Sequence, residues 1–370
     1  MMHTYAARRQ PLGNLMGKNG TPRIMFWELT QGCNLNCIHC RTTAKLERSP
    51  DELTTEQAFE VIDQIVDFVS PILILIGGEP LYRPNFFEIA QYAHDKDIIT
   101  AMASNGTLIN EECAKRIKEV GIRRVAISVD GPNANIHDQF RGLNGAFDAA
   151  LNGARCVKAE GLEEQFNITI TIHNVTYIEE LIALCKRMNV DALHLFMLVP
   201  VGCGIQIAEN NMLNADKYEE VLAWFYDRSR EEKFEIRATC APHYYRIMRQ
   251  KAREYGETIT PKTHGMTTMT KGCLVGTGVH FILHKGNIQP CGYVPVVAGN
   301  VLKTSLKKIW YESDLFLKLR DHTNLEGKCG ICEYMNVCSG CHARAYGIEG
   351  NLFAKEPFCK YIPKCTGTMP

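Results

Sequence analysis

Three cysteines near the start of the chain have a spacing that suits a metal cluster. Cys33, Cys37 and Cys40 follow one another with three and then two residues between them. Thiolates are soft ligands that suit iron–sulfur centres, and three of them bind three corners of a [4Fe–4S] cluster. The fourth iron is then open to another ligand. A closed zinc site with His39 as its fourth ligand is the alternative, but a loop that leaves a strand at the reactive end of a sheet favours the open cluster.

The C-terminal hundred residues contain a second, denser group of cysteines. Eight of the sixteen cysteines lie after residue 270. The chain shows no export signal, and a reducing compartment disfavours disulfides, so clustered cysteines predict metal ligands. Two Cys-x2-Cys pairs are also typical of zinc sites, so a zinc ribbon is the alternative here. The cysteines concerned are Cys273, Cys291, Cys329, Cys332, Cys338, Cys341 and Cys359.

Composition narrows the class of protein. The 370 residues include 41 Lys and Arg and 41 Asp and Glu, so the formal net charge is zero. A general nucleic-acid binder would show a basic excess. No apolar run approaches the roughly 18 residues of a membrane span, and the first twenty residues contain no apolar signal region. We expect a cytoplasmic protein.

The elements that position the first cysteines alternate along residues 23–237. Six strand-like runs and six amphipathic stretches predict six βα units and a parallel sheet with right-handed crossovers. A partial barrel and an open doubly wound sheet both fit this pattern, and in either the chemistry belongs at the carboxyl ends of the strands. The predicted strands are Ile24–Leu29, Ile72–Ile76, Ile98–Ala103, Arg124–Val129, Phe166–Ile172 and Leu193–Val199. The predicted helices are Thr55–Phe68, Asn85–His94, Glu111–Val120, Gly145–Glu160, Tyr177–Met188 and Ala215–Arg230.

Four loops in this order resemble the radical S-adenosylmethionine (SAM) superfamily. The cysteine loop is followed by Gly77-Gly78-Glu79-Pro80, then by Ser104-Asn105-Gly106-Thr107, and then by Ser128-Val129-Asp130-Gly131. Each motif alone is an ordinary turn or helix start, and the shared order and strand-end location carry the resemblance. It covers residues 23–237 and implies a partial (β/α)6 TIM-type barrel.

The resemblance also implies a role for each matching residue. Cys33, Cys37 and Cys40 would hold the cluster, whose open iron binds the amino and carboxylate groups of SAM. The remaining residues would contact the SAM molecule itself: its methionine amino group, its carboxylate, its ribose and its adenine. They are His39, Gly77, Gly78, Glu79, Ser104, Asn105, Ser128, Asp130, Arg141 and Leu198.

The second group of cysteines resembles the SPASM extension, which implies two auxiliary [4Fe–4S] clusters. Matching the motif assigns Cys329, Cys332, Cys338 and Cys359 to an outer cluster, and Cys273, Cys291 and Cys341 to an inner one. The fourth ligand of the inner cluster is open, and Cys240 is a candidate. The expected organisation is an N-terminal segment 1–22, a barrel 23–237, a bridging segment 238–271 and a SPASM domain 272–370.

Two further segments indicate a substrate. Residues 239–243, Thr-Cys-Ala-Pro-His, are similar to a segment of radical SAM enzymes that modify haem-type tetrapyrroles. Residues 22–30 and 39–41 most resemble the haem synthases of the siroheme-dependent pathway. The resemblance implies oxidative decarboxylation of two propionates of iron-coproporphyrin III to vinyls, giving haem b, with flavodoxin or ferredoxin as electron donor. Because cations pair with propionates and histidine binds iron, the candidate substrate residues are Arg23, Arg41, His243, Tyr245 and Arg246.

Three alternatives remain open at this point. A related tetrapyrrole enzyme would remove acetate side chains from didecarboxysiroheme. A SPASM peptide maturase would crosslink a peptide, although only about 22 residues precede the first strand, too few for a winged peptide-binding domain. A non-enzymatic iron–sulfur carrier or scaffold would explain the cysteines and would leave the GGEP motif and the sugar-binding loops without a role.

Overall fold

Parallel strands form the inner layer of the protein. The structure, a computed structural model, describes residues 20–264 and 271–364. Each of the first six strands pairs in parallel with the next one along the chain. The six predicted strands are present, and β7 is a seventh that the sequence pattern did not predict. The strands are β1 Ile24–Glu28, β2 Ile72–Ile76, β3 Ile99–Ser104, β4 Ile122–Ser128, β5 Glu163–Ile170, β6 Ala192–Met197 and β7 Glu235–Thr239.

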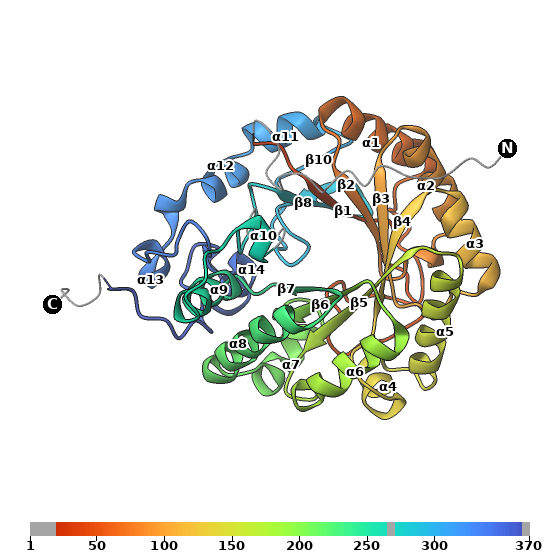
Figure 1. Ribbon diagram of the computed structural model, residues 1–370. Helices are drawn as coiled ribbons and strands as arrows, with labels where there is room; N and C mark the ends of the chain where they lie inside the picture. The colour runs from red at the N-terminus through yellow and green to blue at the C-terminus, as the bar shows by residue number, and fades with distance from the viewer. Residues whose placement is uncertain (1–19, 265–270, 365–370) are drawn as a thin grey trace.

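Helices cover the outside of these strands (Figure 1). Their starts follow the sequence: Thr54 caps α1 in a capping box with Gln57, and Asn110 caps α3 by accepting from the N–H of Cys113. The barrel helices are α1 Thr55–Phe68, α2 Phe86–Asp95, α3 Glu111–Glu119, α4 Ala134–Arg141, α5 Ala146–Ala159, α6 Ile178–Met188, α7 Gly204–Asn211 and α8 Ala215–Glu231. The partial barrel expected from the resemblance is therefore confirmed.

Alternation along the strands separates a packed face from an inner face. Met25 and Trp27 of β1 are fully buried, as are Leu73 and Leu75 of β2. They belong to one core cluster with the apolar residues of the covering helices. The residues between them along each strand face the barrel interior, and the active sites of such barrels lie at the carboxyl ends of the strands.

The C-terminal part of the chain extends the same sheet. Strand β8 (Val279–Ile282) pairs in parallel with the free edge of β1, and β9 (Asn287–Gln289) and β10 (Gly299–Asn300) follow antiparallel. The sheet order among the described residues is β10-β9-β8-β1-β2-β3-β4-β5-β6-β7. Because β8 runs in the same direction as β1, its carboxyl end lies at the same end of the barrel as the cysteine loop.

The remaining helices lie beside the barrel (Figure 1), and the second group of cysteines lies mostly in the loops of this part of the chain. They are α9 His243–Glu254, α10 Pro261–His264, α11 Leu306–Glu312, α12 Asp314–Arg320, α13 Gly327–Gly330 and α14 His342–Glu349. In the described part of the chain, none of the helices has the length and apolar character needed to cross a membrane. Most of the expected N-terminal segment 1–22 lies outside the described residues.

Candidate functional site

Backbone hydrogen bonds hold the first two strand-end loops together. The N–H of Gly78 donates to the carbonyl oxygen of Thr30 at 2.7 Å, and the N–H of Glu79 donates to that of Gly32 at 2.9 Å. A Cβ at Gly78 would lie 2.5 Å from the carbonyl oxygen of Gly32. The glycine is therefore required, because it allows the GGEP loop to pack directly against the cysteine loop.

The first three cysteines lie together in this loop and are surrounded by donors. Burial raises the pKa of Cys33 to about 12, and the charges of Cys37 and Cys40 act in the same direction. Asn105 Nδ2 and Arg141 Nη1 each lie 3.8 Å from a sulfur, those of Cys33 and Cys37 respectively. Buried thiols of this kind become thiolates when a bound metal supplies positive charge, and hydrogen bonds to the sulfurs are typical of iron–sulfur sites. The donor set fits a cluster held at three corners.

Glu79 joins the GGEP loop to the end of β3. Its carboxylate is fully buried and accepts from Ser104 Oγ at 2.9 Å and from the backbone N–H of Asn105 at 2.7 Å. Burial raises the pKa of Glu79 to about 7, against the lowering effect of these hydrogen bonds. Glu79, Ser104 and Asn105 therefore form one connected group beside the cysteine loop, as the sequence motifs predicted for residues at neighbouring strand ends.

A buried ion pair closes the next side of the site. Arg141 Nη2 lies 2.5 Å from Asp130 Oδ2, and His39 Nε2 lies 3.7 Å from the same oxygen. Burial lowers the pKa of His39 to about 4, although Asp130 opposes this, so the imidazole is neutral near pH 7. The ring of His39 packs on Phe140, with the two centroids 4.4 Å apart. The side chain of Arg141 thus lies between an acidic partner and the Cys37 sulfur.

Two further predicted residues flank this group. Ser128 is the last residue of β4 and is half-buried. Leu198 follows β6 and is buried, and its carbonyl oxygen accepts from Arg344 Nη1 at 3.3 Å. The structure therefore brings the SAM-binding candidates to one end of the barrel. Their individual roles remain predictions.

Cys240 lies close to the three inner cysteines. Burial raises the pKa of Cys240 well above its usual value, and the charges of Cys341, Cys291 and Cys273 raise it further. Cys240 follows β7, Cys273 precedes β8, Cys291 follows β9, and Cys341 directly precedes α14. Cys240 has a left-handed backbone with φ of 54°. Cys240 therefore stays the candidate for the fourth ligand, which the motif left unassigned, and its nearness to the other three thiols agrees with that prediction.

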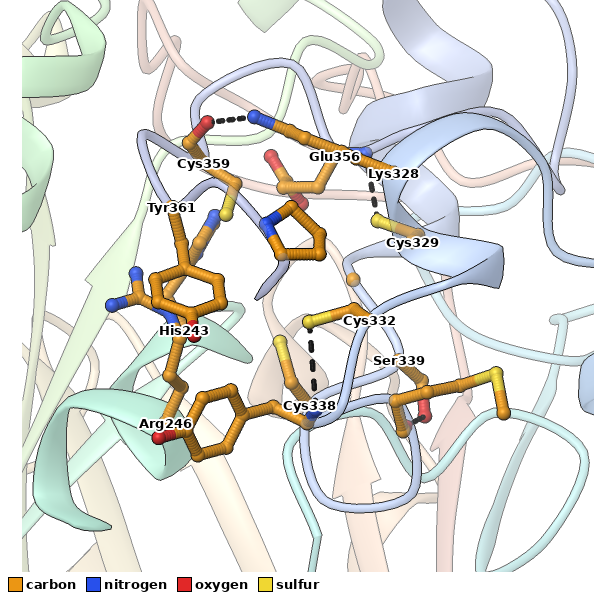
Figure 2. A pocket seen from close by; sticks show the side chains of 14 residues that line it. His243, Arg246, Lys328, Cys329, Cys332, Cys338, Ser339, Glu356, Cys359 and Tyr361 are labelled. Carbon is orange, nitrogen blue, oxygen red and sulfur yellow. Dashed lines mark hydrogen bonds between the residues drawn. The ribbon is translucent and has the colours of Figure 1, made fainter. Parts of the chain in front are cut away.

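The outer cysteines line a separate pocket (Figure 2). Cys329, Cys332, Cys338 and Cys359 point toward its centre. Burial raises the pKa of Cys329 to about 11, and the backbone N–H of Glu356 donates to its sulfur at 3.3 Å. The four thiols and their donors repeat the chemistry of the first site.

The zinc alternatives require a different geometry. A zinc ion holds its sulfur ligands at about 2.3 Å, so zinc needs tighter convergence of the thiols than a four-iron cluster does. Within residues 20–264 and 271–364, no group of three or more Cys, His, Asp or Glu side chains is arranged to hold a single metal ion.

The five candidate substrate residues lie in different places. Arg41 follows Cys40 and donates to Glu28 at 2.8 Å. His243 and Arg246 line the outer cysteine pocket instead. Arg23 precedes β1 and so lies at the opposite end of the barrel, and Tyr245 is on α9. Only Arg41 is therefore placed beside the first cysteine loop.

A larger cavity lies between the first cysteine loop and the inner cysteines. It has about 1140 Å³ of empty space, part of it open to solvent. Arg41 and Thr42, directly after Cys40, line one side, and Gly292 and Tyr293, directly after Cys291, line another. Because this figure includes open solvent, the enclosed part of the cavity is smaller. A substrate here would lie between the two cysteine sites.

Of the residues that line this cavity, sequence reasoning named only Arg41 as a candidate for substrate binding, and three of those it missed matter most here. Glu28, the last residue of β1, and His284 and Lys285, just beyond β8, all line it. The signal for Glu28 was its place at a strand end. No comparable signal existed for His284 and Lys285, because β8 was not among the predicted strands.

Comparison with known proteins shows to which class of enzyme the chain belongs. Residues 27–188 match the family model of the radical SAM superfamily, and residues 273–342 match that of the SPASM iron–sulfur cluster-binding domain. In three dimensions the chain is similar to Streptococcus suis SuiB bound to S-adenosylmethionine, with a TM-score of 0.74 at 16% identity over 92% of this chain and 78% of that one. The chain belongs to the radical SAM superfamily. It is an enzyme that uses SAM and a [4Fe–4S] cluster, and its C-terminal domain binds auxiliary iron–sulfur clusters.

Within the superfamily, two relatives from Methanosarcina barkeri are informative. The chain is 45% identical to the AdoMet-dependent heme synthase of that organism, over 94% of this chain and 99% of the relative. It is 29% identical to its Fe-coproporphyrin III synthase, over 92% and 88%. Since both relatives come from one organism, the difference in identity does not reflect distance between species.

Proposed function

We propose that this enzyme converts iron-coproporphyrin III to haem b by oxidative decarboxylation of two propionates to vinyls. The observation that carries the proposal is the cavity between the Cys40 loop and the inner cysteines, which both Arg41 and Lys285 line. The similarity to a heme synthase over nearly its whole length supports this substrate. The identity to Fe-coproporphyrin III synthase is lower. The alternative reaction, removal of acetate side chains, is therefore the weaker candidate.

The cavity supplies cations for the carboxylates of such a substrate. Arg41 and Lys285 both line it. Arg41 is held in place by hydrogen bonds to Glu28 and to the carbonyl oxygen of Gly292, at 2.8 and 3.0 Å, and lies over the ring of Phe281. A fixed guanidinium binds a carboxylate with little further loss of freedom. Arg41 would therefore orient one propionate.

Each vinyl requires the loss of one hydrogen atom, one carbon dioxide and one electron from a propionate. When bound, SAM and the first cluster supply the radical that removes the hydrogen atom, and the auxiliary clusters supply one-electron acceptors. The chain's own contribution is to enclose this chemistry. The buried Asp130–Arg141 pair and the buried Glu79 group would form one wall of that enclosure. Flavodoxin or ferredoxin is the proposed source of the first electron.

Product analysis tests this function directly. Anaerobically reconstituted and reduced enzyme is incubated with SAM and iron-coproporphyrin III. Mass spectrometry should show two successive losses, each of one carbon dioxide, the abstracted hydrogen atom and the carboxyl proton. One 5′-deoxyadenosine should form for each vinyl. Iron-coproporphyrin III that stays intact while didecarboxysiroheme loses its acetates would contradict the proposal in favour of the alternative.

A further inference from the structure

A carboxylate and a histidine form a buried pair on the wall of the large cavity. Glu28 ends β1, and His284 lies two residues beyond β8, the strand that pairs with β1 in parallel. His284 Nδ1 lies 2.7 Å from Glu28 Oε1. The two side chains are 7% and 2% exposed, and both residues line the cavity. Strand pairing thus brings together two residues that are 256 positions apart.

The charge on Glu28 decides which ring nitrogen of His284 carries the proton. The carboxylate of Glu28 lies between two partners: its Oε2 accepts from Arg41 Nη2 at 2.8 Å, and its Oε1 faces His284 Nδ1. An ionised carboxylate can only accept, so Nδ1 of His284 donates. In the neutral ring the lone pair is then on Nε2, which is the nitrogen available to a ligand in the cavity.

This arrangement is typical of metal-binding histidines. Their second ring nitrogen usually donates to a carboxylate, which orients the ring and makes the other nitrogen a better ligand. The acidic group next to Nε2 is Asp51, whose Oδ1 lies 3.9 Å away, beyond hydrogen-bond distance. Asp51 is 54% exposed and lies 3.5 Å from Lys285 Nζ. Nε2 is therefore not committed to Asp51.

We propose that His284 is an axial ligand of the porphyrin iron, with Glu28 as the residue that orients its imidazole. The inference rests on the proposed function, because it takes the iron porphyrin as substrate. One nitrogen ligand combined with the cations Arg41 and Lys285 in one cavity matches a molecule with a central iron and peripheral carboxylates. His243, the histidine expected from the sequence to approach the iron, lines the outer cysteine pocket instead.

Spectroscopy of the bound porphyrin tests the ligand. Ferric iron-coproporphyrin III is titrated into the anaerobic holoenzyme and followed by absorption and EPR spectroscopy. The wild type should show histidine-ligated iron. His284→Ala should bind about tenfold more weakly or worse and show a water-ligated iron, and added imidazole should restore the histidine-type spectrum. His94→Ala, at an exposed histidine of α2, is the matched control and should behave as wild type.

Iron-free coproporphyrin III separates ligation from a general loss of structure. It has no iron to bind, so wild type and His284→Ala should bind it equally. Glu28→Gln should keep the histidine-type spectrum and raise the midpoint potential of the bound iron, because a less basic imidazole stabilises the ferric state less. An unchanged spectrum in His284→Ala, or an equal loss of affinity for both porphyrins, overturns the inference.

The two proposals fail in different ways. If the wild-type enzyme shows histidine-ligated iron but forms no vinyl, the proposed function is wrong and the assignment of His284 as ligand stands. If vinyl forms normally and the spectrum of His284→Ala is unchanged, the assignment of His284 as ligand is wrong and the proposed function stands.

Discussion

At the scale of single residues, the surroundings of a thiol separate ligand candidates from packing residues. Burial raises the pKa of Cys33 and of Cys185 to about 12 in both cases. Cys33 accepts from Asn105 Nδ2 and from the N–H of Leu35, and other thiols lie near it. Cys185 lies fully buried on α6 within the apolar core. Donors and neighbouring thiols, and not burial, therefore indicate cluster binding.

Loss of any one of Cys33, Cys37 and Cys40 should abolish SAM cleavage. The cluster needs all three thiolates, whereas the auxiliary sites are built from other residues. Each alanine variant should lose roughly a third of the iron, if three four-iron clusters are present, and release no 5′-deoxyadenosine. Cys113→Ala, on the surface helix α3, is the control. Retained cleavage in all three variants would refute the assignment.

Asp130→Asn should weaken SAM binding about tenfold, the effect of one charge-assisted hydrogen bond. Asp130 is fully buried, pairs with Arg141 and accepts from the N–H of Thr169 at 2.7 Å. When Asp130 loses its charge, the guanidinium of Arg141 loses the partner that holds it at the site. Equilibrium binding of SAM to the reconstituted protein measures the effect. Asp67→Asn, on the exposed face of α1, should bind as wild type; equal affinity in both variants would contradict the role of Asp130.

At the scale of elements, the alternation within β5 places one polar residue on the wrong face. Gln165 and Asn167 face the barrel interior, whereas Glu164, Phe166 and Ile168 face the covering helices and are buried. Neither carboxylate oxygen of Glu164 has a hydrogen-bond partner. Burial accordingly raises the pKa of Glu164 to about 8. The position of Glu164 on the helix-facing side of β5 explains this pKa shift, and a role in the SAM site is not needed.

Glu164 should make stability depend on pH. A carboxyl whose pKa is raised on folding, here from 4.5 to about 8, keeps its proton in the folded state. Its stabilising effect is complete below the unfolded pKa and is lost as pH rises through the folded one. Glu164→Gln should therefore gain on the order of 2–4 kcal/mol over wild type between pH 5 and 9. Denaturant unfolding at several pH values measures this difference. The control Glu180→Gln, at an exposed position, should follow the wild type. If the free energy of unfolding of Glu164→Gln changes with pH in parallel with that of the wild type, the expectation is wrong.

At the scale of the whole molecule, one buried ion pair joins the barrel to both auxiliary sites. Arg344 Nε lies 2.8 Å from Glu356 Oε1, and both side chains are almost fully buried. Arg344 donates to the carbonyl oxygen of Cys240 and to the hydroxyl of Tyr218 on α8. Glu356 accepts from the N–H of Cys341 at 2.8 Å, and its own N–H donates to the Cys329 sulfur. The two cysteine groups are therefore structurally coupled.

Glu356→Ala should destabilise the protein by about 3–5 kcal/mol, because it leaves the Arg344 charge buried without a partner. We expect both auxiliary clusters to be lost together, which iron analysis and thermal unfolding would show. Lys360→Ala breaks the exposed pair with Asp216 and should change stability by less than about 1 kcal/mol. Loss of only the outer cluster in Glu356→Ala would argue against the coupling.

Removal of the inner cluster should separate SAM cleavage from product formation. Cys291 belongs to the inner cysteine group, and the next two residues line the large cavity. Cys291→Ala should still release 5′-deoxyadenosine, but form little vinyl product until a chemical oxidant is added, because the electron that leaves with carbon dioxide lacks an acceptor. A soluble variant that makes haem at the normal rate would show that the cluster has no such role.

The sequence by itself determined the six βα units, the class of enzyme and the cofactors, because each depends on patterns within a short stretch of chain. The Gly77–Glu79 loop, for example, is recognisable in sequence since its glycines are required by a close backbone approach. The comparisons confirm the superfamily and its cofactors, whereas the roles of individual site residues and the domain boundaries stay predictions.

Only the tertiary structure decided which distant residues meet. The parallel pairing of β8 with β1 places His284 against Glu28, and the end of β7 brings Cys240 to the inner cysteines. The same folding places His243 in the outer pocket and leaves Arg41 at the large cavity. These outcomes depend on strand order and register between segments far apart in sequence. No local periodicity encodes them, because each short strand gains its place only from the partner it pairs with.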